Sequence, residues 1–568
     1  YDKLNRNTNE VKTFTGLIGK NYSVIRAYNA DSQLSAVTDA ANRQFDYVYN
    51  TRGLLDNVKY GVATLAKYTY SNFGKPNSVE YGNGVKTDLT YDDLSRVTNI
   101  QTNSGTTSLF VQKYTYDAES NRVLMSDGAS NTTTYSYDDL EQLTNVNINN
   151  NGDQSVLSYN YDIYGNRTTQ TNPLSVASYT YTAGTNELDK VVYNNRLTVA
   201  SAFDGNGSLT KETYTKLGKT DKDVSYTWDN QNRLAQINYH YTNRPVFLPA
   251  VPDNTLNFTY DDSGNRTKKQ TTNGTATYYF NSGNIVLNEI GSAGAITKSI
   301  AYGLSPIAEI DQNNKITFIH QDTLGSTVLT TDQSGNIVTK YEYDPFGQLI
   351  GQDGISNTNY LYTGQEYDQE SELYYYNARY YNPRLGRFIS RDPFIGRDGD
   401  SLSRNGFIYV KNNPLKYVDP SGEEEKDVTE DFIKKLKATG FMMYDIGSIN
   451  IIDAISTSWL IPHSVTKYFL SNFLSNVKKE YIDYLSKSVL NDFEANVGSL
   501  YFFYNRFRLG GDWDYKSKSY PKGYADFKKS GVMIGGKKYN WDMPGNIAYG
   551  FTGAAAGFLK ETLTTLAG

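Results

Sequence analysis

Tyr159-Asn-Tyr-Asp-Ile-Tyr-Gly-Asn-Arg, residues 159–167, decides how most of this chain folds. Two aromatic residues two positions apart fit one face of a β-strand, because side chains on a strand alternate between its faces. Asp162 and the Gly165-Asn166 pair then favour a turn, since Asp bonds nearby backbone and Gly adopts left-handed backbone without strain. The stretch therefore predicts a strand, a tight turn and a returning strand, which is a β-hairpin.

The same unit recurs through residues 1–373. Further copies begin at Tyr47, Tyr68, Leu89, Tyr114, Tyr135, Tyr226 and Phe258. Equivalent aromatic residues stand at positions 28, 49, 70, 91, 116, 137 and 161, which are 21 to 25 residues apart. A period of this regularity indicates one supersecondary unit copied many times. One hairpin cannot bury its own apolar face, so we expect the copies to pair side by side in a continuous, curved sheet.

The composition agrees with a β repeat array. The 568 residues include 51 Tyr and 46 Gly but only 14 Pro, and the mean hydropathy is −0.59. A chain of this length is too long for one core. The absence of Cys excludes disulfides and Cys-ligated metals, and the three His residues are too far apart in sequence to favour a His-rich metal site. No run of 18 apolar residues is present, so a simple membrane-spanning helix is not expected.

The repeated Tyr-x-Tyr-Asp unit has two interpretations. In the first, the aromatics are scaffold and each Asp caps a turn. In the second, exposed Tyr faces stack on sugars and the repeats bind carbohydrate. The spacing supports the scaffold and adds nothing specific to the carbohydrate hypothesis.

Residues 374–422 close the repeat region with three long motifs. They are Tyr-Tyr-Asn-Ala-Arg-Tyr-Tyr (375–381), Gly-Arg-Phe-Ile-Ser-Arg-Asp-Pro (386–393) and Asn-Asn-Pro-Leu-Lys-Tyr-Val-Asp-Pro-Ser-Gly (412–422). These resemble the core that ends the repeats of Rhs/YD-repeat proteins. The resemblance implies an exported bacterial protein whose β-hairpins spiral into a hollow shell, whereas periodicity alone also fits an open solenoid. Because Tyr1-Asp2 falls within a repeat, we expect the chain to be a fragment of a longer one.

Four carboxylates in this core are candidates for chemistry. Asp392, Asp398, Asp400 and Asp419 lie within 28 residues of one another. Two carboxylates brought together in a closed space can share a proton, so that one acts as an acid while the other activates water. The alternative is that all four only cap turns.

The family resemblance makes the first interpretation specific. It implies an aspartyl self-cleaving site in which Arg391 and Asp392 match the Arg-Asp-Pro pair, and Asp398 or Asp400 supplies the second carboxylate. The implied cleavage region is Asp419, Pro420, Gly422 and Glu423. The family usually has a hydrophobic residue after this Gly, and here it is Glu423.

Residues 423–568 have a different character. A charged linker leads into Thr429-Glu-Asp-Phe-Ile, which has an N-cap, acidic residues in the first turn and apolar residues at helical spacing. We therefore expect a mostly α, or α+β, domain. Gly510-Gly-Asp-Trp-Asp-Tyr-Lys and Gly545-Asn-Ile-Ala-Tyr-Gly resemble the polymorphic toxin type 44 domain, which implies a nuclease.

The residue types in this region suit phosphodiester chemistry. Residues 501–540 contain nine Lys or Arg against three Asp. The candidate toxin site consists of Arg506, Asp512, Asp514, Lys516 and Asp542, and the candidate nucleic-acid contacts are Arg508, Lys518, Trp513 and Tyr515. Cations bind phosphate, aromatic rings stack on bases, and the carboxylates can act as acid and base or hold a divalent metal.

The alternatives for this region are structural or membrane-directed. Asp514 and Lys516 fit an ordinary ion pair, and Gly545–Gly557 fits a close helix contact. The same run of small residues would also suit a pore-former, although it is too short for a simple span.

The sequence thus predicts a β shell over 1–373, a core over 374–422 and a toxin-like domain over 423–568. The expected partners are a cognate immunity protein, a nucleic-acid substrate and a secretion machinery, and the toxin domain is expected to act in the cytoplasm of a target cell. The rival hypothesis is a non-enzymatic adhesion or carbohydrate-binding scaffold at the cell surface.

Overall fold

The computed structural model describes residues 1–242, 253–355, 358–394, 396–397, 400–428, 532–534 and 537–539. The chain forms two compact units, Tyr1–Leu436 and Lys437–Gly568. In the second unit the described residues are two short paired strands, β38 (Val532–Ile534) and β39 (Lys537–Tyr539). The helices expected after residue 428 lie outside the described residues. No helix in the described part of the chain is long and apolar enough to cross a membrane.

The first unit is built on one antiparallel sheet. Across its described residues the sheet has 31 strands, and each strand pairs with the next one in sequence. The first half consists of β1 (Asn9–Lys12), β2 (Tyr22–Tyr28), β3 (Leu34–Thr38), β4 (Gln44–Tyr49), β5 (Leu55–Tyr60), β6 (Ala63–Tyr70), β7 (Pro76–Tyr81), β8 (Val85–Tyr91), β9 (Val97–Ser104), β10 (Thr107–Tyr116), β11 (Arg122–Ser126), β12 (Thr132–Tyr137), β13 (Leu143–Asn150), β14 (Asp153–Tyr161) and β15 (Arg167–Asn172). The second half consists of β16 (Ser175–Tyr181), β17 (Leu188–Tyr193), β18 (Leu197–Phe203), β19 (Leu209–Lys216), β20 (Lys219–Trp228), β21 (Leu234–Tyr241), β22 (Asn254–Tyr260), β23 (Arg266–Thr271), β24 (Ala276–Ser282), β25 (Ile285–Gly291), β26 (Ile296–Tyr302), β27 (Pro306–Asp311), β28 (Ile316–Gln321), β29 (Thr327–Thr331), β30 (Ile337–Tyr343) and β31 (Leu349–Gly354).

The two aromatic residues of each repeat have different tasks. The first is buried, as Tyr159 is at 1% exposure. The second donates its hydroxyl hydrogen bond to a backbone carbonyl one hairpin earlier, as from Tyr161 to Leu143 (2.8 Å) and from Tyr137 to Arg122 (2.7 Å). Equivalent bonds run from Tyr49, Tyr70, Tyr91, Tyr116, Tyr181, Tyr260, Tyr302 and Tyr343. Each copy is thereby tied to the copy before it.

Where a repeat has Asp after its two aromatic residues, that Asp caps a turn, as the scaffold interpretation predicts. Asp162 Oδ1 accepts hydrogen bonds from the backbone N–H groups of Tyr164 and Asn166, both at 2.9 Å. Gly165 in this turn has a φ of +77°, a left-handed conformation that glycine adopts without strain. Asp138, Asp229, Asp261 and Asp332 make the same pair of bonds.

The hydroxyl link predicts a measurable cost. Tyr161→Phe should lower the free energy of unfolding by about 0.5–1.5 kcal/mol, because the Leu143 carbonyl loses its donor while ring packing is kept. Urea unfolding followed by circular dichroism checks this. The matched control is Tyr164→Phe, since Tyr164 is 57% exposed on a turn and should change stability by less than about 0.5 kcal/mol. Equal effects of the two changes would contradict the assigned role.

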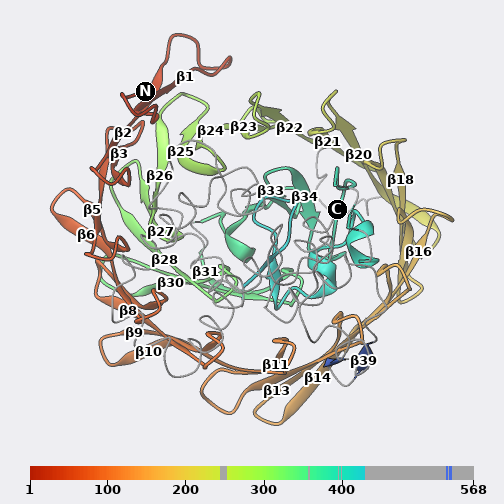
Figure 1. The fold of residues 1–568 in the computed structure, drawn as a ribbon. Coiled ribbons are helices and arrows are strands. Elements are labelled where there is room, and N and C mark those ends of the chain that lie inside the picture. Colours follow the sequence, from red (N-terminus) through yellow and green to blue (C-terminus); the bar gives the residue numbers. More distant parts are fainter. Residues whose placement is uncertain are drawn as a thin grey trace, which may run out of the picture. The chain divides into compact units, whose positions relative to one another are not determined.

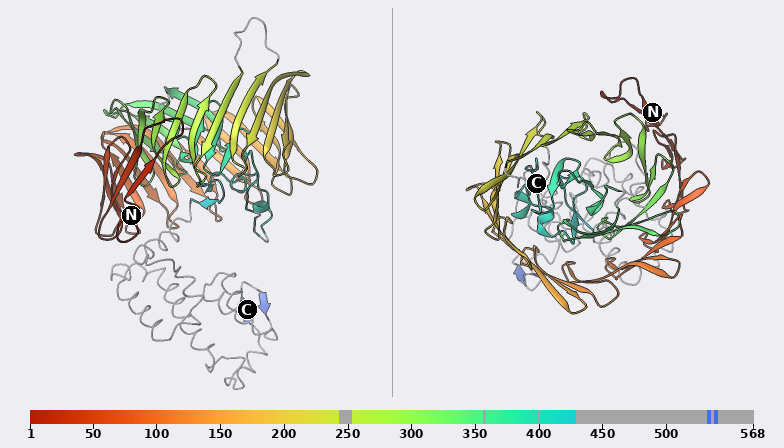
Figure 2. Two further views of the ribbon diagram at one scale, coloured as in Figure 1. Left: turned by 90° about the horizontal axis from the view of Figure 1, so that it is seen from above. Right: turned by 180° about the vertical axis from the view of Figure 1, so that it is seen from behind.

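Within the first unit the sheet curls through more than a full turn. The strands follow one another around a ring, and β25–β30 lie inside β2–β9 (Figure 1; Figure 2, right). Buried residues of β4–β7 pack against those of β26–β28 in one hydrophobic cluster. Arg43 reaches across the two layers to the carbonyl oxygen of Ile310 (3.1 Å), and Asn83 reaches the hydroxyl of Thr331 (2.8 Å). The expectation of a spiralling sheet is therefore confirmed, and an open solenoid is excluded.

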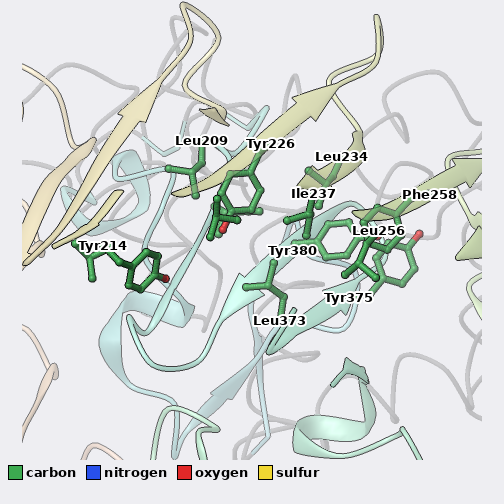
Figure 3. Packing of buried hydrophobic residues seen from close by; sticks show 13 residues of the cluster. Leu209, Tyr214, Tyr226, Leu234, Ile237, Leu256, Phe258, Leu373, Tyr375 and Tyr380 are labelled. Atoms are coloured by element: carbon green, nitrogen blue, oxygen red, sulfur yellow. The ribbon is translucent and has the colours of Figure 1, made fainter. Parts of the chain in front are cut away.

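The core that follows the sheet lies inside the ring (Figure 1). Its described elements are η1 (Tyr362–Gly364), β32 (Glu366–Asp368), β33 (Leu373–Tyr376), β34 (Arg379–Asn382), β35 (Arg387–Phe388), η2 (Leu402–Arg404), η3 (Val410–Asn412), β36 (Tyr417–Val418) and β37 (Lys426–Asp427). Leu373, Tyr375 and Tyr380 of the core pack against Leu234, Ile237 and Phe258 of the sheet, as Figure 3 shows.

Buried polar contacts also hold the core to the sheet. Arg266 of β23 pairs with Asp368 (2.5 Å) and Glu366 (2.8 Å) of β32. Asn412 donates to the carbonyl oxygen of Gly165 (2.8 Å) in a repeat turn. Because such pairs are directional, they fix where the core sits against the sheet.

Candidate functional site

Arg379 is the centre of the candidate site. It begins β34, its side chain is 5% exposed, and its guanidinium lies 3.7 Å from the centre of the Phe388 ring. This stacking on an aromatic face leaves the edges of the guanidinium free to donate hydrogen bonds.

Arg379 joins two carboxylates that are distant in sequence. Its Nη2 lies 2.7 Å from Asp392 Oδ2 and 3.5 Å from Asp419 Oδ2. Its Nη1 donates to the carbonyl oxygen of Gly406 (3.0 Å). The fourth contact is made by Nε, which donates to the carbonyl oxygen of Gly422. One buried cation thus faces two acids and two peptide carbonyls.

The peptide bond between Gly422 and Glu423 is held at both ends. Arg379 contacts its carbonyl oxygen, and Asp419 Oδ1 accepts a hydrogen bond from its N–H at Glu423 (3.1 Å). Asp419 Oδ1 also accepts from the N–H groups of Gly422 (2.8 Å) and Glu424 (3.2 Å). The Gly422–Glu423 peptide bond therefore lies between a cation and a carboxyl group.

The chain before this bond is pinned to the core. Ala378 N–H donates to the carbonyl oxygen of Ser421 (3.1 Å), and Asn377 Nδ2 donates to that of Pro420 (3.0 Å). Gly422 has a φ of +77°, and a Cβ at this position would collide with the carbonyl oxygen of Tyr376. Only glycine therefore fits here without a shift of the neighbouring backbone.

Burial shifts the pKa values of the three charged groups of the site. Desolvation raises the pKa of Asp392 and of Asp419, and Arg379 opposes part of each shift. Desolvation also lowers the pKa of Arg379. Two carboxyl groups that hold a proton more readily than usual are suited to acid–base exchange.

A cleft of about 290 Å³ adjoins this bond. Ser421 and Glu423, on either side of Gly422, line it together with Arg379, Ser390 and Arg391. It offers polar partners and enough room for water molecules.

The residues predicted from sequence are only partly brought together. Asp392 lies in the site as expected. Asp400 instead pairs with Lys411 (2.8 Å), and Arg391 is exposed, with its backbone N–H bonded to Gly207 (3.1 Å). Asp398 lies outside the described residues. In the described part of the core, Asp419 is the acid that shares Arg379 with Asp392.

Arg379 was not predicted from sequence, although it stands within the Asn-Ala-Arg-Tyr-Tyr motif. A lone Arg between Tyr residues on a strand gives no sign of its partners. The signal that could have found it is a charged residue at a position whose strand neighbours are all buried.

The candidate toxin residues lie outside the described part of the chain. These are Arg506, Arg508, Asp512, Trp513, Asp514, Tyr515, Lys516, Lys518 and Asp542. Within the described residues, no group of three or more His, Asp or Glu side chains could hold a metal ion.

Comparison with known proteins identifies the shell. The teneurin YD-shell family model matches residues 5–253 and 238–413, which is most of the first unit. The chain belongs to the teneurin YD-shell family. This confirms the resemblance to YD-repeat proteins that the repeats and the closing motifs carry.

The relatives include named nucleases and toxin subunits. The tRNA3(Ser)-specific nuclease WapA of Bacillus spizizenii is 36% identical over 276 residues, which are 48% of this chain and 11% of that protein. The toxin subunit YenC1 of Yersinia entomophaga is 26% identical over 296 residues, covering 47% of this chain and 29% of that subunit. The chain therefore spans a small part of the length of these relatives.

Solved structures show the same fold. The crystal structure of TcdB2-TccC3 superposes with a TM-score of 0.58 at 21% identity, covering 71% of this chain and 22% of that one. The Tc holotoxin pore of Photorhabdus luminescens gives a TM-score of 0.57 at 21% identity, covering 76% and 22%. Named YD-shell nucleases and toxin subunits are thus among the relatives of this chain in sequence, and the Tc complexes contain the same fold.

Proposed function

We propose that this chain is part of an exported YD-shell toxin that cuts its own Gly422–Glu423 bond and thereby separates a C-terminal nuclease from its shell. The observation that carries the proposal is that both sides of this bond are hydrogen-bonded. Arg379 donates to its carbonyl oxygen, and Asp419 accepts from its N–H. Scaffold turns elsewhere in the chain use an Asp to cap backbone N–H groups, as Asp162 does. At Asp419 a buried guanidinium is added on the other side of the bond.

The geometry supports hydrolysis as follows. Arg379 polarises the Gly422 carbonyl and stabilises the negative charge that develops on its oxygen. A water molecule entering from the cleft adds to the carbonyl carbon, and Asp392 accepts its proton. The C–N bond then breaks as protonated Asp419 gives its proton to the nitrogen of Glu423. One water molecule is consumed, and the new acid at Gly422 passes its proton to the new amine at Glu423, which leaves a carboxylate and an ammonium group.

The test is a cleavage assay on the full chain. Purified 1–568 should give two fragments on a denaturing gel, and mass spectrometry should place the break after Gly422. Asp392→Asn and Asp419→Asn should both remain intact, because each amide lacks the proton exchange that the step needs. Asp31→Asn, an exposed turn residue, is the matched control and should be cut like the wild type. An intact wild-type chain would overturn the proposed scission.

The same assay decides which acid is the second one. The sequence hypothesis predicts that Asp398→Asn or Asp400→Asn stops cleavage, whereas the geometry predicts this of Asp419→Asn. Since Asp400 neutralises Lys411, its replacement should leave the cut fragments unchanged in size and at most slow their formation. Cleavage that persists in Asp419→Asn would exclude Asp419 as the proton donor.

The nuclease part of the proposal rests on two supports. The motifs at Gly510–Lys516 and Gly545–Gly550 resemble a toxin domain, and the WapA relatives are named as tRNA nucleases. We propose that the substrate of this domain is a nucleic acid and that an immunity protein protects the producing cell. We also propose that a secretion machinery exports the protein and that the nuclease acts in a target cell. Once cut, the chain can be assayed directly on RNA and DNA, with and without a divalent metal.

A further inference from the structure

The segment that follows the candidate bond does not leave the core. Residues Glu423–Val428 belong to the first compact unit, although they lie downstream of Gly422. Lys426 and Asp427 form β37, which pairs antiparallel with Tyr417 and Val418 of β36. Val428 N–H donates to the carbonyl oxygen of Lys416 (3.0 Å). Backbone pairing therefore spans the two sides of the bond.

Side chains extend this contact. Glu425 lies 3.0 Å from Lys411 Nζ, and the two side chains are each 25% exposed. Lys411 is also held by Asp400 at 2.8 Å, which orients its ammonium group toward the segment. Glu424 lies 3.2 Å from Arg397, but these side chains are more than half exposed, so this pair contributes less.

Apolar packing closes the far end of the segment. Val428 packs against a buried cluster that includes Tyr159 and Leu143 of the sheet and Leu415 of the core. The acidic run Glu423–Glu425 thus lies beside basic side chains on the core surface, and Val428 makes the apolar contact of the segment.

We propose that β36, Lys411 and Asp419 form a binding surface that holds the new amino terminus after the cut, so that scission and release are separate steps. This rests on the proposed cleavage after Gly422. Hydrolysis turns the N–H of Glu423 into an ammonium group, which lies where Asp419 Oδ1 already accepts a hydrogen bond at 3.1 Å. Having given up its proton in the reaction, Asp419 is a carboxylate. The contact therefore changes from an amide hydrogen bond into a charge-assisted one, which is stronger.

The occupant of this surface is an extended acidic segment with a free amino terminus. Its recognition elements are an ammonium at position 423, a carboxylate at position 425, a strand edge at 426–427 and an apolar side chain at 428. The surface is complete before the cut, so binding needs no rearrangement of the core.

The experiment compares cleavage and separation in the same sample of 1–568. A denaturing gel measures the cut fraction, and gel filtration without denaturant measures whether the fragments stay together. In low salt the fragments should elute as one species. Lys411→Gln and Val428→Ser should each be cut like the wild type, and the fragments should separate about tenfold faster or more. Lys86→Gln, which breaks an exposed pair with Asp88, is the control and should not change retention.

Two outcomes would overturn the proposal. One is that the wild-type fragments separate at once in low salt. The other is that they stay together equally well in Lys411→Gln and Val428→Ser, since retention would then come from another part of the chain.

If the chain is not cut, the proposed cleavage is wrong, but the binding surface can still be tested on the intact chain. Hydrogen exchange on intact 1–568 should show a protected amide at Val428, and Lys411→Gln should accelerate its exchange by about tenfold. Rapid exchange of this amide in the wild type would remove the surface independently of any cut.

Discussion

Asp368→Asn is expected to lower the free energy of unfolding of the first unit by about 3–5 kcal/mol, because it removes one of the two buried carboxylates of an ion cluster. Asp368 is fully buried and lies 2.5 Å from Arg266 Nη1 and 2.9 Å from Lys269 Nζ. Burial alone would raise its pKa, yet the two cations hold the pKa below its usual value. Asparagine keeps the shape but leaves two positive charges facing a neutral amide.

The cluster makes this change larger than most. Glu366 also pairs with Arg266 (2.8 Å) and accepts a hydrogen bond from Tyr279 (2.8 Å), so the whole group joins β23 and β24 to β32. Loss of one member therefore weakens the attachment of the core to the sheet. Denaturant unfolding followed by circular dichroism measures the effect.

A matched control separates burial from charge. Asp88 pairs with Lys86 at 2.6 Å, but the two side chains are 41% and 47% exposed. Asp88→Asn should therefore cost no more than about 1 kcal/mol. If both variants unfold at the same denaturant concentration, the buried cluster does not stabilise the fold. Adding Lys269→Gln to Asp368→Asn should recover part of the loss, because Lys269 is then left with the partly exposed Glu370 (3.1 Å) as its partner and removing its charge restores the balance of the cluster.

His320 should make the shell lose stability in acid. Its side chain is fully buried, its Nε2 lies 2.8 Å from the hydroxyl of Thr331, and the Tyr81 ring packs against it at 4.4 Å. Burial lowers its pKa from 6.5 to about 3. The folded protein therefore keeps the imidazole neutral while the unfolded chain binds a proton. Stability falls by about 1.4 kcal/mol per pH unit as the pH drops from about 6.5 toward about 3.

Other groups titrate in the same window, so the test needs a difference between variants. Burial raises the pKa of Asp344 from 3.8 to about 6, which adds stability as the pH falls and opposes the effect of His320. Comparing wild type with His320→Gln cancels Asp344. The wild type should lose stability faster, so the two curves should converge as the pH is lowered. Parallel curves for the two proteins would contradict the assignment to His320.

The sequence predicted what depends on neighbouring residues. Each hairpin follows from two aromatics, an Asp and a turn residue within nine positions, as at 159–167, and the sheet of paired repeats was expected from their spacing. The inner layering could not be predicted, because it rests on contacts such as Arg43 with Ile310, which are 267 residues apart. A period of 21 to 25 residues carries no information about where the second turn of the sheet meets the first.

Only part of the candidate site was predicted, because its residues also come from distant parts of the sequence. Asp392 stands in a long motif, so its place in the core was accessible from sequence. Arg379 and Asp419 are 40 residues apart and meet only when β34 and the end of the core fold together. From its position in the sequence Asp400 was as good a candidate for the second acid as any. In the structure it pairs with Lys411 instead, and no sequence spacing predicts that pair.

The contacts between the two layers of the sheet also fix how many repeats the protein can have. Tyr22 meets Gly294, Arg26 meets Ser282, and Asn83 meets Thr331, so one circuit of the sheet corresponds to about 250–270 residues of chain. Deleting or duplicating a single hairpin between them would move every later partner by one repeat length and misalign all of these contacts together. The number of hairpins therefore sets the circumference of the shell. The shell should tolerate a substitution or a short insertion within one hairpin loop far better than the gain or loss of a whole hairpin.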